Sequence, residues 1–127
     1  MVIYKYEVEQ GKVISAPFVK LLDIQEQGDK FVLWAIVEPN APELTSRVVF
    51  NILGTGWWFD NPPGKYVKTV QDLEGLVWHF FGDADDMRLL LEFGSPDMID
   101  DRLNYAKNKA YDNLDINKDY DAMAALT

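Results

Sequence analysis

The stretch LVWHFFGDADDMRLLLEF, residues 76–93, holds the change of pattern that decides the fold class. Its first six residues, 76–81, are almost all apolar or aromatic, which is typical of a β-strand. After Gly82 the acidic residues come first and the leucines follow, and this order indicates a short helix capped by Asp83 or Asp85. The sequence therefore predicts strands up to this stretch and helices beyond it.

Strand patterns fill most of the chain before residue 76. Apolar and charged residues alternate from Val2 to Glu9, which is the period of a strand with one buried face. The run FVLWAIV, residues 31–37, is apolar on both faces and predicts a central strand. Three further strands are expected at 18–26, 47–53 and 66–71. With the strand at 76–81 they predict a meander of five or six antiparallel strands.

Helical signals follow the last predicted strand. Ser95 and Pro96 fit the N-cap and the first position of a helix that covers about residues 96–113. Apolar residues recur within that range at helical spacing. A second, shorter helix is expected near residues 118–126.

The predicted fold class is α+β, with an N-terminal antiparallel sheet and C-terminal helices packed on or beside it. We expect a single domain, residues 1–127, with a sheet part at 1–81 and an acidic helical extension at 82–127. The net charge is −9, and the extension alone carries eleven acids against five bases. Such a surface repels phosphates, so we expect no direct nucleic-acid binding and a basic rather than an acidic partner.

Composition also bears on the cellular compartment. The chain contains no cysteine, which excludes disulfides and thiolate chemistry and is typical of a reducing compartment. Its first residues alternate apolar and charged types and do not resemble a signal peptide. The longest apolar run, residues 31–37, is too short to span a bilayer. We therefore expect a cytoplasmic protein that makes no membrane contact.

The segment NILGTGWWFD, residues 51–60, raises the question of a phosphate-binding turn. A dinucleotide or P-loop motif needs residues that are missing after Gly54-Thr55-Gly56, so the glycines more simply indicate a bulge or bend. Trp57 and Trp58 are adjacent, and on a strand they would point to opposite faces. We therefore expect one ring in the core and the other in a contact surface, most simply that of a homodimer.

Six aspartates form an acidic set around the predicted helix starts. Capping and the helix dipole give one explanation for them. The alternative is an acidic surface that binds a basic, nucleic-acid-handling protein in place of phosphates. With Trp57 and Trp58, these aspartates are the candidate partner-binding residues: Asp83, Asp85, Asp86, Asp97, Asp100 and Asp101.

Catalytic and metal-binding patterns are weak. His79 is the only histidine, so a catalytic triad or a histidine-ligated metal would have to be built around it alone. Asp115–Asp121 resembles the start of a calcium loop, but Tyr120 replaces the required glycine and Leu126 the bidentate acid. We expect no catalytic residue, no cofactor and no metal, and hence a protein that is not an enzyme.

A family resemblance rests on four segments taken together: VIYKYEV, LLDIQEQGDKFVLWAIVEPNAP, NILGTGWWFD and LVWHFF. In this order they resemble a family of short, uncharacterised bacteriophage and prophage proteins. Its members start with an Ile-Tyr-Lys-Tyr strand, carry a Leu-Trp-Ala run and a Gly-Thr-Gly turn, and end near Val-Trp-His. The match covers about residues 2–81 and implies no activity or binding residues. The Trp-Trp pair and the acidic helical extension depart from the family pattern.

The resemblance and the composition together lead to one main functional hypothesis. It is a non-enzymatic phage accessory protein that acts in the infected host cell. It binds and inhibits, or redirects, a bacterial host or defence protein through an acidic and aromatic surface. One alternative is a sponge that binds a nucleotide-like signal with aromatic residues and Arg47 or lysines. Another is a structural or assembly protein of the phage particle.

Overall fold

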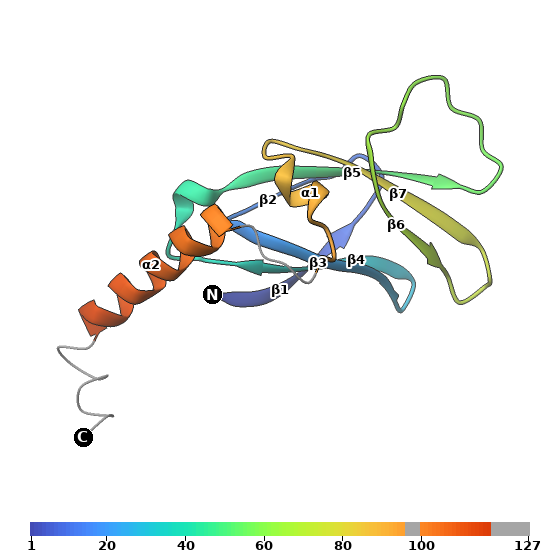
Figure 1. Ribbon diagram of the computed structural model, residues 1–127. Coiled ribbons are helices and arrows are strands. Elements are labelled where there is room, and N and C mark those ends of the chain that lie inside the picture. Colours follow the sequence, from blue (N-terminus) through green and yellow to red (C-terminus); the bar gives the residue numbers. More distant parts are fainter. Residues whose placement is uncertain (96–99, 118–127) are drawn as a thin grey trace.

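The computed structural model describes residues 1–95 and 100–117 (Figure 1). Strands and helices follow one another along the chain, with one short 3-10 helix, η1, at Pro42–Leu44. The strands of the described residues are β1 Val2–Val8, β2 Val13–Ala16, β3 Phe18–Gln27, β4 Lys30–Val37, β5 Ser46–Gly54, β6 Lys65–Gln71 and β7 Val77–Ala84. The helices of the described residues are α1 Arg88–Leu91 and α2 Asp100–Asn117.

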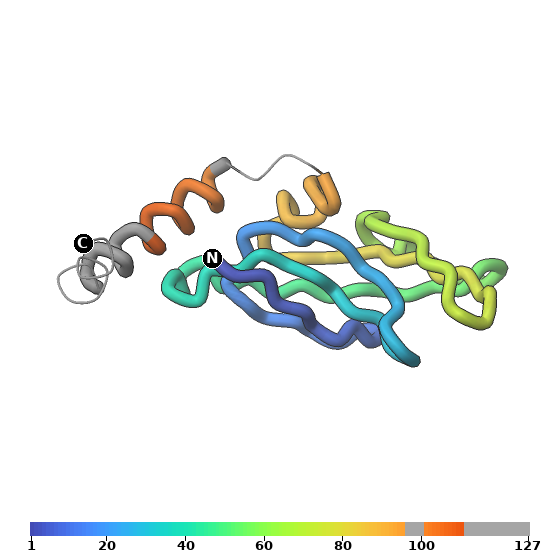
Figure 2. Tube along the Cα trace, turned by 90° about the horizontal axis from the view of Figure 1, so that it is seen from below, coloured from blue at the N-terminus to red at the C-terminus, as the bar shows by residue number. Residues whose placement is uncertain are grey.

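The strands form two antiparallel sheets. One has the order β1-β4-β3, and the other has the order β2-β5-β7-β6. Side chains from both sheets make one hydrophobic core, and the two sheets lie against each other as a sandwich (Figure 2). The core includes the fully buried rings of Phe18, Phe50 and Phe80. Phe31 of one sheet meets Phe80 of the other edge to face, with 5.0 Å between ring centroids.

The single meander predicted from the sequence is wrong in strand count and in layout. The short strand β2 was missed, and Pro17 separates it from β3. The chain passes from one sheet to the other at β2 and returns at β3. In β2 only Ile14 and Ala16 are buried, so four residues give too little alternation to identify a strand. The coarser prediction holds, since antiparallel strands precede helices, and β4 is the central strand of its sheet.

The predicted break at Gly82 is also wrong, because β7 continues to Ala84. A Cβ at Gly82 would lie 2.8 Å from Cδ2 of Leu90, so the glycine lets α1 pack closely against the sheet. Neither Asp83 nor Asp85 caps α1. The N-cap residue is Met87, and Oδ1 of Asp86, the residue before it, accepts a hydrogen bond from the backbone N–H of Arg88 at 3.0 Å.

Helix α2 confirms that a helix follows the sheet. The predicted start at Pro96 and the predicted helix at 118–126 lie outside the described residues. In both views of the trace, α2 extends away from one end of the sandwich (Figures 1 and 2). Neither helix in the described part of the chain has the length and apolar character needed to cross a membrane.

Candidate functional site

The sandwich has two ends that differ in their side chains. We call the end near α1 and α2 the helix end. The opposite end carries the β3–β4 turn, the β5–β6 loop and the β6–β7 turn, and we call it the loop end (Figure 1). The end of β3 and the β6–β7 turn are joined directly, because the backbone N–H of Leu73 donates to Oε2 of Glu26 at 2.7 Å.

Three consecutive aromatic residues stand out at the loop end, and we call residues 57–59 the aromatic loop. Trp57 is 56% exposed, Trp58 is 97% exposed and Phe59 is 54% exposed. The expectation that one tryptophan lies in the core is therefore wrong. Strand β5 ends at Gly54, and Gly56 turns the chain with a φ of 87°, so both tryptophans follow the strand and lie in the loop.

The base of the aromatic loop is held in place by local contacts. The backbone N–H of Trp57 donates to the carbonyl of Gly54 at 3.1 Å, and that of Thr55 donates to the carbonyl of Val77 at 3.3 Å. The ring of Trp57 meets the ring of Trp78 edge to face, with 5.4 Å between centroids. A Cβ at Gly54 would lie 2.8 Å from the Trp57 indole. The glycines thus serve the turn and the packing of Trp57.

Two hollows adjoin at this end of the molecule. The aromatic hollow, about 250 Å³, is lined by Gly54, Thr55, Trp57, Leu76, Val77 and Trp78. The acidic hollow, about 460 Å³, is lined by Glu26, Gly28, Asp29, Asp72, Leu73, Glu74, Leu76 and Trp78. The two share Leu76 and Trp78, so they form one continuous surface beside the aromatic loop.

The carboxylates of the acidic hollow fall into two groups. Asp72 accepts a hydrogen bond from Nε1 of Trp78 at 2.9 Å and others from backbone N–H groups of its own turn. These bonds, the Trp78 bond above all, lower the pKa of Asp72. The side chains of Asp29 and Glu74 make no hydrogen bond or ion pair within the described residues. The sequence analysis missed this cluster, because the segments around Asp29 and Asp72 were interpreted only as turns.

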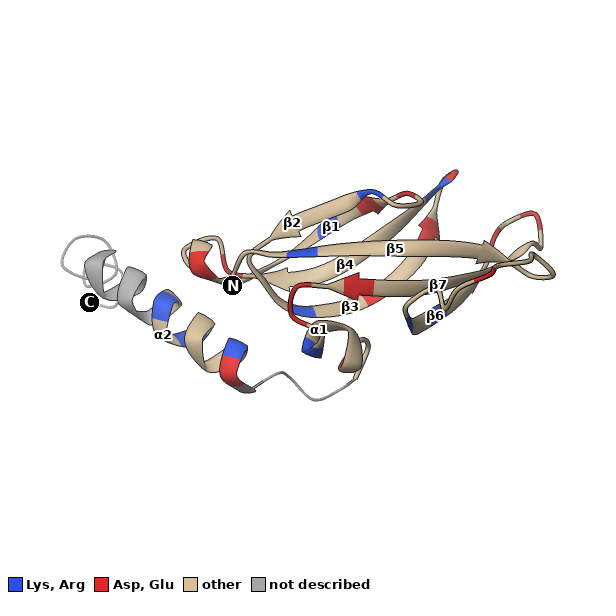
Figure 3. Ribbon diagram, turned by 90° about the horizontal axis from the view of Figure 1, so that it is seen from above, with Lys and Arg blue, Asp and Glu red and all other residues tan. Residues whose placement is uncertain are grey.

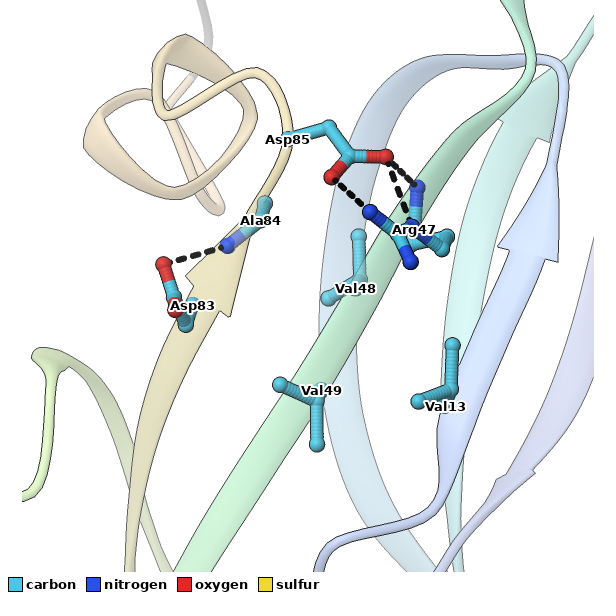
Figure 4. Close-up of a pocket in the computed structure, with 7 residues that line it drawn as sticks. All are labelled: Val13, Arg47, Val48, Val49, Asp83, Ala84 and Asp85. Carbon is cyan, nitrogen blue, oxygen red and sulfur yellow. Dashed lines mark hydrogen bonds and ion pairs between the residues drawn. The ribbon is translucent and has the colours of Figure 1, made fainter.

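The members of the predicted acidic set whose side chains the structure describes lie at the helix end and accept hydrogen bonds within the protein: Asp83, Asp85, Asp86 and Asp101. Asp85 binds the guanidinium of Arg47 through both carboxylate oxygens, each at 3.1 Å, beside a shallow pocket on the outer face of the second sheet (Figure 4). The hydrogen bonds from Arg47 lower the pKa of Asp85. Asp83 lies in the same pocket, and its side chain accepts a bond from the backbone N–H of Ala84.

Asp86 and Asp101 are joined by Arg88. Nη2 of Arg88 lies 3.2 Å from Oδ2 of Asp86, and Nη1 lies 3.0 Å from Oδ2 of Asp101. Burial raises the pKa of Asp86, but bonds from Arg88 and Arg102 outweigh it and lower that pKa to about 2. Figure 3 shows acidic and basic positions close together in this region. The side chain of Asp100 and all of Asp97 lie outside the described part.

Arg102 of α2 is the residue at the helix end that the sequence analysis did not identify. Its side chain is buried and donates to the carbonyls of Phe18 and Leu44 and, at 2.9 Å, to Oδ2 of Asp86. One arginine thus connects α2 to a strand, to η1 and to the segment before α1. The only signal in the sequence is a basic residue on an otherwise acidic helix start.

His79 lies between two hydroxyl groups on the outer face of the second sheet. Its Nε2 is 2.8 Å from Oγ1 of Thr55, and its Nδ1 is 3.0 Å from Oγ1 of Thr69. In the part of the chain that the structure describes, no three His, Asp or Glu side chains are grouped so as to hold a metal ion. Residues 118–121 of the incomplete calcium loop are not among those described.

Comparison with known proteins identifies a family. The model of a domain of unknown function, DUF7352, matches residues 1–88, which is more than half of the chain, and the chain therefore belongs to that family. The matched part contains the whole sandwich and the aromatic loop, and it ends at the first residue of α1. No curated protein and no solved structure matches the chain.

Proposed function

We propose that this DUF7352 protein is a non-enzymatic binding module that anchors in a pocket of a partner protein through its aromatic loop. The proposal includes the setting drawn from the sequence resemblance. In that setting the protein is a phage accessory factor in the cytoplasm of an infected cell, and the partner is a bacterial host or defence protein that it inhibits or redirects.

The observation that carries this proposal is the exposure of residues 57–59, above all the 97% exposure of Trp58. Large aromatic side chains are costly to leave in water and are enriched among the residues that dominate binding energy at protein interfaces. The base of the loop is already ordered by Gly54, Gly56 and the Trp57–Trp78 contact. A preordered anchor loses less conformational entropy when it binds.

Two features bear on the contact surfaces that were expected near the helix end. The guanidinium of Arg47, one of the cations expected to meet the phosphate of a nucleotide-like signal, is held by both oxygens of Asp85. Three of the six acids that were expected to meet a basic partner, Asp85, Asp86 and Asp101, already bind Arg47, Arg88 or Arg102. Both arguments move the expected contact surface from the helix end to the loop end.

The test compares three tagged proteins in a pull-down from bacterial lysate, with bound proteins identified by mass spectrometry. Trp58→Ala removes the anchor. Leu91→Ala is the matched control, because Leu91 is also an exposed apolar residue, 63% exposed, and it lies in α1 at the helix end, away from the aromatic loop. A protein captured by wild type and Leu91→Ala but lost with Trp58→Ala supports the proposal. Equal capture by all three proteins contradicts it.

Self-association needs a separate control, since a second copy could also cover the aromatic loop. Sedimentation of the wild type and Trp58→Ala across a range of protein concentrations tests this. A dimer that Trp58→Ala dissociates would identify the loop as a homodimer contact and contradict a foreign partner at this surface.

A further inference from the structure

We propose that the two adjoining hollows of the loop end bind a basic peptide segment of the partner protein. An arginine or lysine would lie over the acidic hollow and an apolar side chain against Trp57. This inference rests on the proposed function and specifies the chemistry of the partner.

The first step concerns shape. Leu76 and Trp78 line both hollows. A bound peptide can therefore extend from one hollow into the other while it contacts these two shared residues. Leu73 stands at the rim of the acidic hollow with 85% of its surface exposed, and Leu76 is 53% exposed. The surface therefore offers apolar contact along its length, as a groove for an extended segment does.

The second step concerns charge. Four carboxylates and no basic side chain line the acidic hollow. The nearest base in sequence, Lys30, is directed to Glu7, with 3.4 Å between Nζ and Oε2. Asp29 and Glu74 have no partner among the described residues, so their charge is available to a ligand. Complementary charge of this kind selects a cation and repels phosphates.

The third step concerns the rings. The face of an indole attracts a cation, and arginine in particular stacks on such faces while its stem makes apolar contact. Trp57 and Trp78 stand beside the acidic hollow, so aromatic surface and negative charge lie within one binding surface. A neutral apolar segment would cover the carboxylates without pairing them, which costs free energy. A basic segment with apolar residues can pair with the carboxylates and also pack against the aromatic rings.

The experiment is an NMR titration of the ¹⁵N-labelled protein with the tetrapeptide acetyl-Leu-Arg-Arg-Leu-amide. Its control is the same peptide with citrulline in place of arginine, which keeps the shape and removes the charge. We expect the arginine peptide to shift the indole N–H signals of Trp57 and Trp78 and the amide signals of Leu73 and Leu76. Equal shifts with the citrulline peptide would overturn the inference.

Two charge-matched variants sharpen the test. Asp29→Asn with Glu74→Gln removes the two unpaired carboxylates, whereas Asp83→Asn with Glu9→Gln removes the same charge from residues that line neither hollow. Exposed pairs are weak, so we expect the first double variant to bind the peptide about three- to tenfold less tightly and the second to bind like wild type. If both double variants bind the peptide equally more weakly than wild type, the loss comes from the net charge of the protein alone, and the inference is overturned.

The proposed function can fail or survive independently of this result. If the peptide does not distinguish arginine from citrulline but Trp58→Ala still loses the captured protein, the aromatic anchor stands and the basic segment is rejected. If Trp58→Ala retains the protein while the Asp29 and Glu74 variant loses it, the hollows bind the partner and the aromatic anchor is rejected.

Discussion

At the helix end, Asp85, Asp86 and Asp101 each bind an arginine, whereas at the loop end Asp29 and Glu74 have no partner within the described residues. The difference shows that the number of acids in a segment does not locate a binding surface. The extension after Gly82 has the larger excess of acids, and yet its described carboxylates mostly stabilise the contacts of α1 and α2. The loop end has fewer acids, but two of them, Asp29 and Glu74, remain available together with aromatic surface.

The largest expected effect is at Arg102, and it tests the structural role of the helix end. Arg102→Met keeps the apolar stem but leaves two carbonyls and part of Asp86 without a donor. We expect the docking of α2 to weaken by about 3 kcal/mol. Amide hydrogen exchange over residues 101–110 should then speed up by about 100-fold.

Lys107→Met is the control on the same helix, because Lys107 is exposed and should leave the exchange rates unchanged. If both variants exchange like wild type, the buried arginine does not hold α2. The claim that the charged residues of the helix end serve the fold would then be wrong for Arg102.

The next effect concerns pH and Asp86. Its pKa falls from an ordinary value of about 4 to about 2 in the folded protein. A lowered pKa means that the ionised carboxylate stabilises the fold above about pH 4 and that this contribution is lost as the pH falls through about 2. Asp86→Asn should therefore cost about 2 kcal/mol of unfolding free energy at pH 7, and the difference from wild type should shrink toward pH 2.

Urea unfolding at several pH values measures this difference. Asp83→Asn serves as the comparison and should change the unfolding free energy by less than about 0.5 kcal/mol at pH 7. A cost for Asp86→Asn that stays constant from pH 7 to pH 2 would show that the loss is not electrostatic.

A smaller effect is expected at the base of the aromatic loop. Gly54→Ala places a Cβ 2.8 Å from the Trp57 indole, so the ring must move. The ring is more than half exposed and can do so, and we expect a cost of about 1 kcal/mol. In a Trp57→Ala background the same change should cost little, because the clashing ring is gone. Equal costs in both backgrounds would place the strain in the backbone instead.

The smallest expected effect is that of Trp58 on stability. Because 97% of its surface is exposed, Trp58→Ala should change the unfolding free energy by less than about 0.5 kcal/mol, measured by thermal and urea unfolding. A loss above about 1 kcal/mol would mean that the ring belongs to the fold, and the loop end would then resemble the helix end.

Local patterns predicted much of the fold, and long-range contacts account for what they missed. The run at 31–37 identified a central strand because its apolar residues occupy both faces, and β4 has that position. A local sequence pattern does not show which sheet a strand joins. The sequence analysis therefore predicted one meander where the structure has two sheets. The turn at Gly54 and Gly56 was read as a bend within a strand, which placed Trp57 and Trp58 on opposite faces.

The role of the candidate residues in binding a partner stays a prediction. For Trp57 and Trp58 the sequence analysis expected one ring in the core, and this was wrong, because both rings are exposed. The partners of the helix-end acids could not be predicted, since Arg47 is 38 residues from Asp85 in the sequence. The acidic hollow was missed for the same reason, because its two turns are brought together only by the fold.

The position of β7 has a consequence for folding during synthesis. It is synthesised after the other described strands, and yet it lies between β5 and β6 in the four-stranded sheet. Until residues 77–84 emerge, β6 has no neighbour in its sheet, and β5 has only the four-residue β2. Nascent chains that end before residue 77 therefore expose unpaired strand edges, which promote aggregation and recruit chaperones. A chain that stops there lacks every pairing of β7, whereas loss of α2 leaves the strand pairings of both sheets intact.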